Sequence, residues 1–244
     1  DPNARRFAVE GVVSGNITDD RQKKRRELLH SLDSLKLATP GHPVTAQLGT
    51  TESKAYEMIL GDAGKLFDLS TEDNAIRQRY GRNTFGQSCL MARRLVQAGV
   101  PFVTINYGGW DTHKQHFEAM RRKLPQMDMA MATLLQDLEE HGLLDSTIVW
   151  WSGEFGRSPK VAWPGPWNGG RHHFGKCFSA ALAGGGFKGG QVVGASDATG
   201  ENVAERPVYP PDVLGSICEL MGINPDSPLP NPRGLELSVM PSGK

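Results

Sequence analysis

The sequence has few cysteines, no excess of charge of either sign and no long apolar run. Its 244 residues include three cysteines, too few and too scattered for a disulfide framework or a CxxC metal site. The 27 basic and 27 acidic side chains cancel, so the basic surface typical of nucleic-acid-binding proteins is missing. No stretch approaches the roughly 18 apolar residues of a membrane-spanning helix. The composition therefore predicts neither a nucleic-acid partner nor a membrane span.

The first hundred residues are predicted to be helical. Thr18 can cap the first of these helices, in which leucines recur at helical spacing. Gly99 is a typical stop for the last one, whose apolar side includes Phe85 and Leu90. The predicted helices cover residues 19–37, 43–60, 71–81 and 84–98. None of them carries a chemical signature.

From residue 101 onward the pattern alternates between strands and helices. Continuous apolar and β-branched residues predict buried strands over 101–107 and 147–151, on either side of a helix over 115–141. Two more strands are expected over 177–183 and 191–193, followed by a helix over 211–221. A strand, a helix and a strand in succession indicate a right-handed crossover between parallel strands, and hence an α/β fold.

Polar side chains follow both predicted parallel strands. Because the carboxyl ends of such strands meet at one edge of a sheet, the two loops are expected to face one crevice. Imidazole and carboxylate groups together suit zinc, manganese or iron, and two such metals can clamp a phosphoryl or sulfuryl group. Arg157 or Arg171 can supply a bidentate contact to the oxygens of that group. The possible metal ligands in these loops are Asp111, His113, His116, Glu154, His172 and His173.

Most of these residues have a structural alternative. Asp111 is also able to cap the helix that follows it, and His116 has the position of an ordinary surface histidine at a helix start. Glu154 can pair with Arg157 in place of a metal. One of His172 and His173 is expected to point away, since successive side chains diverge in an extended loop.

Two glycine-containing motifs do not predict a nucleotide site or a serine nucleophile. Residues 184–189 match G-x-G-x-x-G, but the segment that follows is predicted to be a strand, so no helix N-terminus is available for a pyrophosphate. Residues 194–198 begin like a nucleophile elbow but have Ala198 in place of the last glycine. A nucleotide-binding oxidoreductase and a serine hydrolase are therefore disfavoured.

Several motifs, in this order along nearly the whole chain, resemble the DUF1501 family of bacterial proteins. They are Tyr80-Gly-Arg-Asn, Ala92–Gly99, Gly109–His113, Gly153–Pro159, Gly170–His173 and Gly184–Gly190. The resemblance implies an alkaline-phosphatase-like or sulfatase-like fold, in which a central, mostly parallel sheet is flanked by helices. It also implies that Asp111, His113, Glu154 and His173 are metal ligands, with His116 and His172 as possible additional ones. The family more often has Asp where this chain has His172.

The resemblance also places the chain with the alkaline phosphatase and sulfatase superfamily, from which it departs in its first hundred residues. Superfamily enzymes take an aspartate ligand and a nucleophile from an early strand and helix, and no such pair is visible before Pro101. The expected organisation is a helical N-terminal region over 1–82 and the C-terminal part of a larger α/β domain over 83–244. The alternative is a shortened relative that lacks half of the catalytic machinery. Full-length relatives resemble exported proteins, which implies a periplasmic or extracellular location that no signal in this chain shows.

These observations favour a metal-dependent hydrolase of phosphate or sulfate esters. One or two divalent ions, zinc or manganese, would be its cofactor, Arg157 would balance charge on the transferred group, and Arg171 would bind substrate. The expected substrate is a small-molecule or glycan ester. The alternative is a non-catalytic binding or assembly protein that keeps the sulfatase-like fold without the nucleophile.

Overall fold

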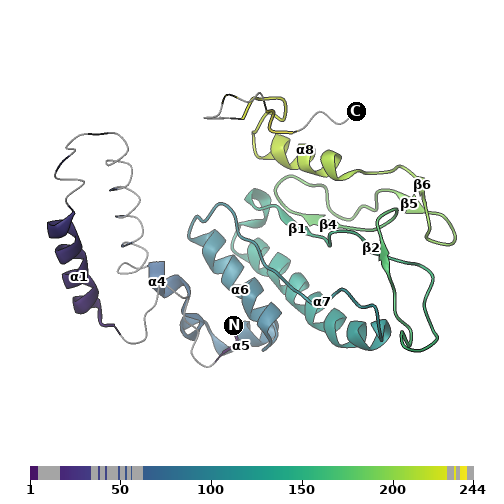
Figure 1. Ribbon diagram of the computed structural model, residues 1–244, viewed down its shortest axis with the longest axis horizontal. Helices are drawn as coiled ribbons and strands as arrows, with labels where there is room; N and C mark the ends of the chain where they lie inside the picture. The colour runs from purple at the N-terminus through teal and green to yellow at the C-terminus, as the bar shows by residue number, and fades with distance from the viewer. Residues whose placement is uncertain are drawn as a thin grey trace. The chain divides into compact units, whose positions relative to one another are not determined.

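The computed structural model describes residues 1–4, 17–33, 63–229 and 237–240, together with residues 38, 42, 49, 53, 56 and 234 (Figure 1). The chain divides into two compact units, Asp1–Ile105 with Met129–Met131 and Asn106–Asp128 with Ala132–Lys244. The helix predicted over 43–60 lies almost entirely outside the described residues. The predicted division between 1–82 and 83–244 stays a prediction.

Helices account for the regular structure of the described residues in the first unit. The Thr18 side chain accepts a hydrogen bond from the backbone N–H of Arg21 and so caps the first helix, and the Asn83 side chain caps another through the N–H of Gly86. The Thr18 cap is as the sequence predicts. The helices that the structure describes here are α1 (Asp19–Leu32), α4 (Ala63–Leu66), the 3₁₀ helix η1 (Leu69–Thr71), α5 (Asn74–Arg79) and α6 (Thr84–Gln97).

The core of the first unit forms around α6. Gly86 is required there, because a Cβ at this position would lie only 2.0 Å from the carbonyl oxygen of Tyr80. The fully buried Gln87 side chain donates to the carbonyl oxygens of Arg77 and Gly81. These two hydrogen bonds replace those that the Gln87 amide group would make with water. The buried apolar residues are Leu69, Tyr80, Phe85, Cys89, Leu90, Met91, Ala92 and Ala130.

The second unit contains two long helices and several very short strands. The helices are α7 (His116–Glu140), which includes Pro125, the 3₁₀ helix η2 (Leu144–Ser146) and α8 (Pro210–Leu220). The strands are β1 (Val149–Trp151), β2 (Gly156–Arg157), β3 (His173–Phe174), β4 (Ala181–Ala183), β5 (Ala195–Ser196) and β6 (Val203–Glu205). Among the described residues, none of the helices combines the length and the apolar character that crossing a bilayer requires.

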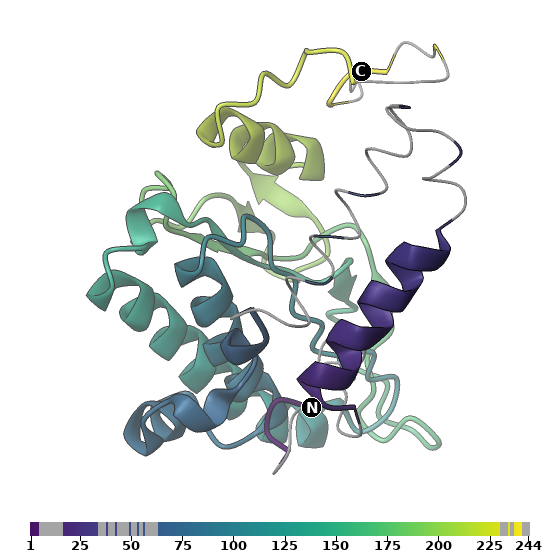
Figure 2. The ribbon, with the colours of Figure 1, turned by 90° about the vertical axis from the view of Figure 1, so that its left-hand side faces the viewer.

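The predicted alkaline-phosphatase-like fold, with a central, mostly parallel sheet, is wrong. Strands in the described part of the chain pair only two by two, and every pair is antiparallel: β1 with β4, β2 with β3, and β5 with β6 (Figures 1 and 2). Val149 lies opposite Ala183, and Trp151 opposite Ala181. An apolar run reads alike in a parallel sheet and in an antiparallel pair, which is why the sequence pattern did not distinguish them.

The strands predicted over 101–107 and 191–193 are also wrong. Both segments lack strand structure, and their apolar side chains include Phe102, which is 81% exposed, and Val192, which is 95% exposed. Their β-branched and aromatic residues favour an extended backbone, but a ladder also needs a neighbouring strand. Without a strand at 101–107, the predicted parallel crossover is absent from the described residues.

Candidate metal centre

Asp111 and His113 lie in the loop that leads into α7. The helix begins at His116, and Gln115 at the N-cap position has a left-handed backbone with φ 50° and makes no side-chain capping bond. Asp111 is therefore not the cap of this helix. The buried Thr112 side chain lies between the two residues and places its Oγ1 2.6 Å from Nδ1 of His116. This contact ties the loop to the first turn of the helix.

A second loop, residues 167–171, is hydrogen-bonded along the first. The backbone N–H groups of Gln115 and His116 donate to the carbonyl oxygens of Trp167 and Gly169. The N–H of Arg171 donates back to the carbonyl oxygen of Thr112 at 3.2 Å. The two backbones approach so closely that a Cβ on Gly170 would lie 1.8 Å from the carbonyl oxygen of His113. These bonds bring together segments that are distant in the sequence.

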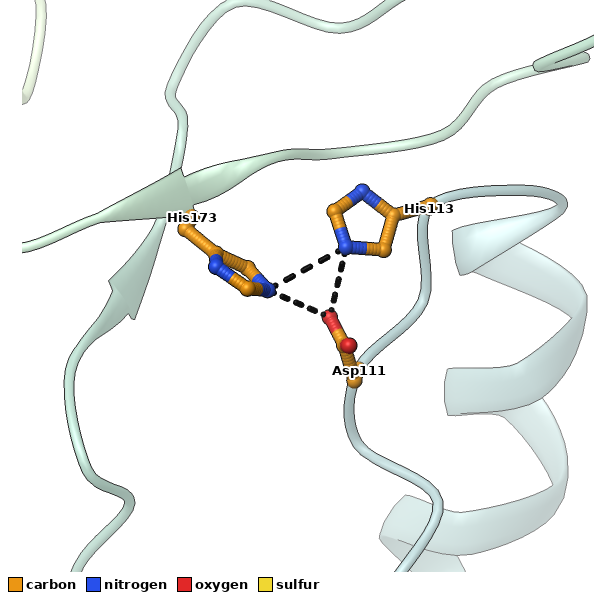
Figure 3. A group of neighbouring side chains, drawn as sticks. All are labelled: Asp111, His113 and His173. Atoms are coloured by element: carbon orange, nitrogen blue, oxygen red, sulfur yellow. Dashed lines mark hydrogen bonds and ion pairs between the residues drawn. The ribbon is translucent and has the colours of Figure 1, made fainter.

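Three potential ligand atoms meet where the loops join (Figure 3). Oδ1 of Asp111 lies 2.9 Å from Nε2 of His113 and 2.9 Å from Nε2 of His173. The two Nε2 atoms lie 3.1 Å apart. His173 comes from β3, whereas Asp111 and His113 come from the loop before α7 (Figure 3). All three side chains are partly exposed to solvent, Asp111 by 57%, so the cluster is accessible from outside.

The spacing of these atoms fits a first-row transition metal. For ligands about 2.1 Å from a metal, neighbouring donor atoms lie about 3.0 Å apart in octahedral and about 3.4 Å apart in tetrahedral geometry. The three observed distances, 2.9, 2.9 and 3.1 Å, are close to the octahedral value. Two imidazoles and one carboxylate are also donors that zinc, manganese and iron accept.

Cationic and polar neighbours keep Asp111 ionised. Desolvation alone would raise the pKa of Asp111, but the hydrogen bond with His173 and the charges of Arg157 and His113 outweigh it and hold that pKa below its ordinary value. Nη1 of Arg157 lies 2.5 Å from Oδ1 of Asp111. The carboxyl group is therefore in the form that binds a cation at neutral pH.

Glu154 lies beside this cluster but outside it. Its carboxylate is 3.2 Å from Nη2 of Arg157, so the guanidinium bridges Asp111 and Glu154. This is the ion pair that the sequence left open as the alternative to a metal ligand. The role of Glu154 as a ligand stays a prediction.

The remaining predicted site residues have structural partners. His116 is buried, and desolvation, with the charges of Arg171 and Arg157, lowers its pKa, so it is neither a surface histidine nor one of the three clustered ligands. The Arg171 guanidinium donates to the backbone carbonyl oxygens of Ser158 and Arg157. Nδ1 of His172 lies 3.2 Å from Nδ1 of His113, so His172 contacts a clustered ligand.

Sequence reasoning did not identify two residues on which this site depends. Ser158 accepts a hydrogen bond from the backbone N–H of His172 through Oγ and one from the Arg171 side chain through its carbonyl oxygen. Gly170 allows the close approach of the two loops. The adjacent pair Gly169-Gly170 was the available signal, because two successive glycines in a loop indicate a backbone in close contact with another segment.

The sequence model of one family, described as a protein of unknown function (DUF1501), matches residues 8–243 of this chain. No curated protein matches the chain. No solved structure matches it either.

Proposed function

The chain belongs to the DUF1501 family, and we propose that it binds a divalent metal ion through Asp111, His113 and His173 and hydrolyses phosphate or sulfate esters. The observation that carries the proposal is the meeting of the three donor atoms within 3.1 Å of one another. Zinc and manganese are the metals we favour, and the same donor set also suits iron.

The charges around the cluster favour an anionic substrate. Asp111 and Glu154 contribute two negative charges, and Arg157 and Arg171 contribute two positive ones, so the four side chains sum to zero. With neutral histidines, a bound divalent cation would bring this region to a charge of +2. That charge complements a phosphate monoester dianion, and to a lesser extent a sulfate ester anion.

Each residue has a defined task in this proposal. Asp111, His113 and His173 hold the metal, and their partial exposure leaves room for an ester on the solvent side. A metal held there would supply Lewis acidity and would lower the pKa of a water molecule to near neutrality. Arg157, whose side chain is 12% exposed, orients the Asp111 carboxylate and places positive charge beside it, where charge builds up on the transferred group.

A non-catalytic role has one observation in its favour. Arg157 already neutralises Asp111 and Glu154 through two ion pairs, so the site is electrostatically satisfied without a metal. In that case the cluster would connect the loops at Asp111 and at Glu154 and serve binding or assembly rather than hydrolysis.

An activity panel separates the two functions. The wild type is assayed with an aryl phosphate and an aryl sulfate, each with added zinc, manganese or ferrous iron, beside Asp111→Asn and the control Asp145→Asn in η2. We expect metal-dependent hydrolysis that Asp111→Asn lowers by at least about 100-fold in kcat/KM, and that Asp145→Asn leaves unchanged. Absence of hydrolysis from a wild type that binds metal would favour the non-catalytic role.

A further inference from the structure

We propose that His172 is a positioning residue that fixes the tautomer and the orientation of the His113 ring. The inference rests on the metal site proposed above and adds a function for a histidine outside the three ligands. Metal-binding histidines commonly donate the N–H of the second ring nitrogen to a neighbouring acceptor, which orients the ring and increases its basicity as a ligand.

The two nitrogens of His113 have different surroundings. Nε2 lies 2.9 Å from Oδ1 of Asp111 and 3.1 Å from Nε2 of His173, at the place where the ligand atoms meet. Nδ1 lies 3.2 Å from Nδ1 of His172. A neutral imidazole carries one proton, and a metal requires the lone pair of the nitrogen that faces it. Metal binding at Nε2 therefore places the proton on Nδ1, from which it is donated to His172.

His172 is held well enough to act as that acceptor. Its backbone N–H donates to Oγ of Ser158 at 3.0 Å. Its ring meets the edge of Trp167, with centroids 5.1 Å apart and planes at 84°. The carbonyl oxygen of Ser158 also accepts a 2.6 Å hydrogen bond from Nε of Arg171. This bond holds the backbone of Ser158 in place beside His172. The acceptor nitrogen thus has a fixed direction toward His113.

Side-chain geometry supplies matched variants for a test. In Asn, Oδ1 occupies the position that Nδ1 has in His, so His172→Asn keeps an acceptor opposite His113. In Gln the amide group lies one carbon farther out, and in Leu the group is apolar, so His172→Gln and His172→Leu remove the acceptor. His172→Gln keeps a polar side chain and so controls for the apolar character of leucine.

The first measurement is the affinity of each protein for Zn²⁺ and for Mn²⁺, at a pH near 8 where ordinary imidazoles are neutral. Loss of the acceptor is expected to weaken binding by about 10- to 100-fold in His172→Gln and His172→Leu, with one ion per chain still bound at saturation. His172→Asn is expected to bind within about threefold of the wild type. Equal affinity of His172→Leu and the wild type would overturn the proposal.

The second measurement needs no activity and is made on the zinc-loaded protein, because without a metal the Asp111 carboxylate, 2.9 Å away, favours a proton on Nε2 of His113. With zinc on Nε2, nitrogen-15 and proton NMR report on the Nδ1–H group of His113. In the wild type and in His172→Asn this proton is expected to be hydrogen-bonded, with a downfield shift and slow exchange with water, whereas in His172→Leu it is expected to move upfield and to exchange faster. An unchanged Nδ1–H signal in zinc-loaded His172→Leu would refute the role of His172 even though the metal site is real. A wild type that binds no zinc would instead refute the proposed function.

Discussion

Replacement of Gly170 by alanine tests whether the contact between the two loops builds the site. The Cβ of alanine would lie 1.8 Å from the carbonyl oxygen of His113 and 2.5 Å from its carbonyl carbon. Ordinary van der Waals contact begins at 3.4 Å, so the backbones must separate by about 1.6 Å. The φ angle of Gly170 lies outside the left-handed region, so alanine causes no backbone strain at this position.

The displacement should affect stability and metal binding together. Overpacking of this kind costs about 1–3 kcal/mol, which lowers the melting temperature by about 2–4 °C for each kcal/mol in a chain of this size. A shift of about 1.6 Å is large beside the 2.9–3.1 Å spacing of the ligand atoms. We therefore expect the affinity of Gly170→Ala for Zn²⁺ to fall by at least about tenfold.

Gly175→Ala is the matched control, because nothing lies within 4 Å of a Cβ at that position and it belongs to the same segment as His173. Calorimetric melting and zinc titration of both variants decide the outcome. The control is expected to melt at or slightly above the wild-type temperature and to bind zinc normally. A Gly170→Ala protein that behaves like Gly175→Ala in both assays would refute the argument that loop contact positions His113.

Two further predictions concern the first unit. Glu72→Gln should lower the free energy of urea unfolding by about 3 kcal/mol, because it breaks an ion pair with Arg93, whose side chain is only 6% exposed. Asp20→Asn breaks an exposed ion pair on α1 and should change the free energy of unfolding by about 0.5 kcal/mol or less. Equal effects of Glu72→Gln and Asp20→Asn would contradict this reasoning. Burial raises the pKa of the Cys89 thiol to about 12, so above the ordinary thiol pKa the unfolded chain loses this proton before the folded one does. The free energy of unfolding should therefore fall by about 2 kcal/mol between pH 7 and pH 10 because of this thiol. The measurement is urea unfolding of the wild type and of Cys89→Ala at both pH values, and an equal fall in the two proteins would contradict the prediction.

Helices were predictable here because their signals are local. Thr18 and Asn83 cap their helices through the N–H groups of residues only three positions away, and the apolar spacing of α6 lies within one element. The pairing of strands depends instead on segments far apart. The run over 147–151 does contain a strand, but its partner, β4, and their antiparallel direction depend on contacts some thirty residues away.

The candidate site illustrates the same difference. The sequence predicted one ligand set of Asp111, His113, Glu154 and His173. The structure brings the ligand atoms of Asp111, His113 and His173 together, whereas Glu154 pairs with Arg157 beside them, and metal binding itself stays a prediction. The expected reason, adjacent ends of parallel strands, is wrong. The two loops are joined instead by backbone hydrogen bonds between residues 112–116 and 167–171, which a glycine pair permits. Such bonds have no periodic pattern, so sequence alone identified the residue types but not the contact that assembles them.

The central claim is that three side chains form one metal site, and calorimetric titration of Zn²⁺ and Mn²⁺ into the chelator-treated protein tests it most directly. Wild type, His173→Gln and the α1 control His30→Gln are titrated at the same pH and salt concentration. The account predicts one ion per chain for the wild type and for His30→Gln, and an affinity at least about 100-fold lower for His173→Gln. Equal binding by all three proteins, or no binding by the wild type, would contradict it.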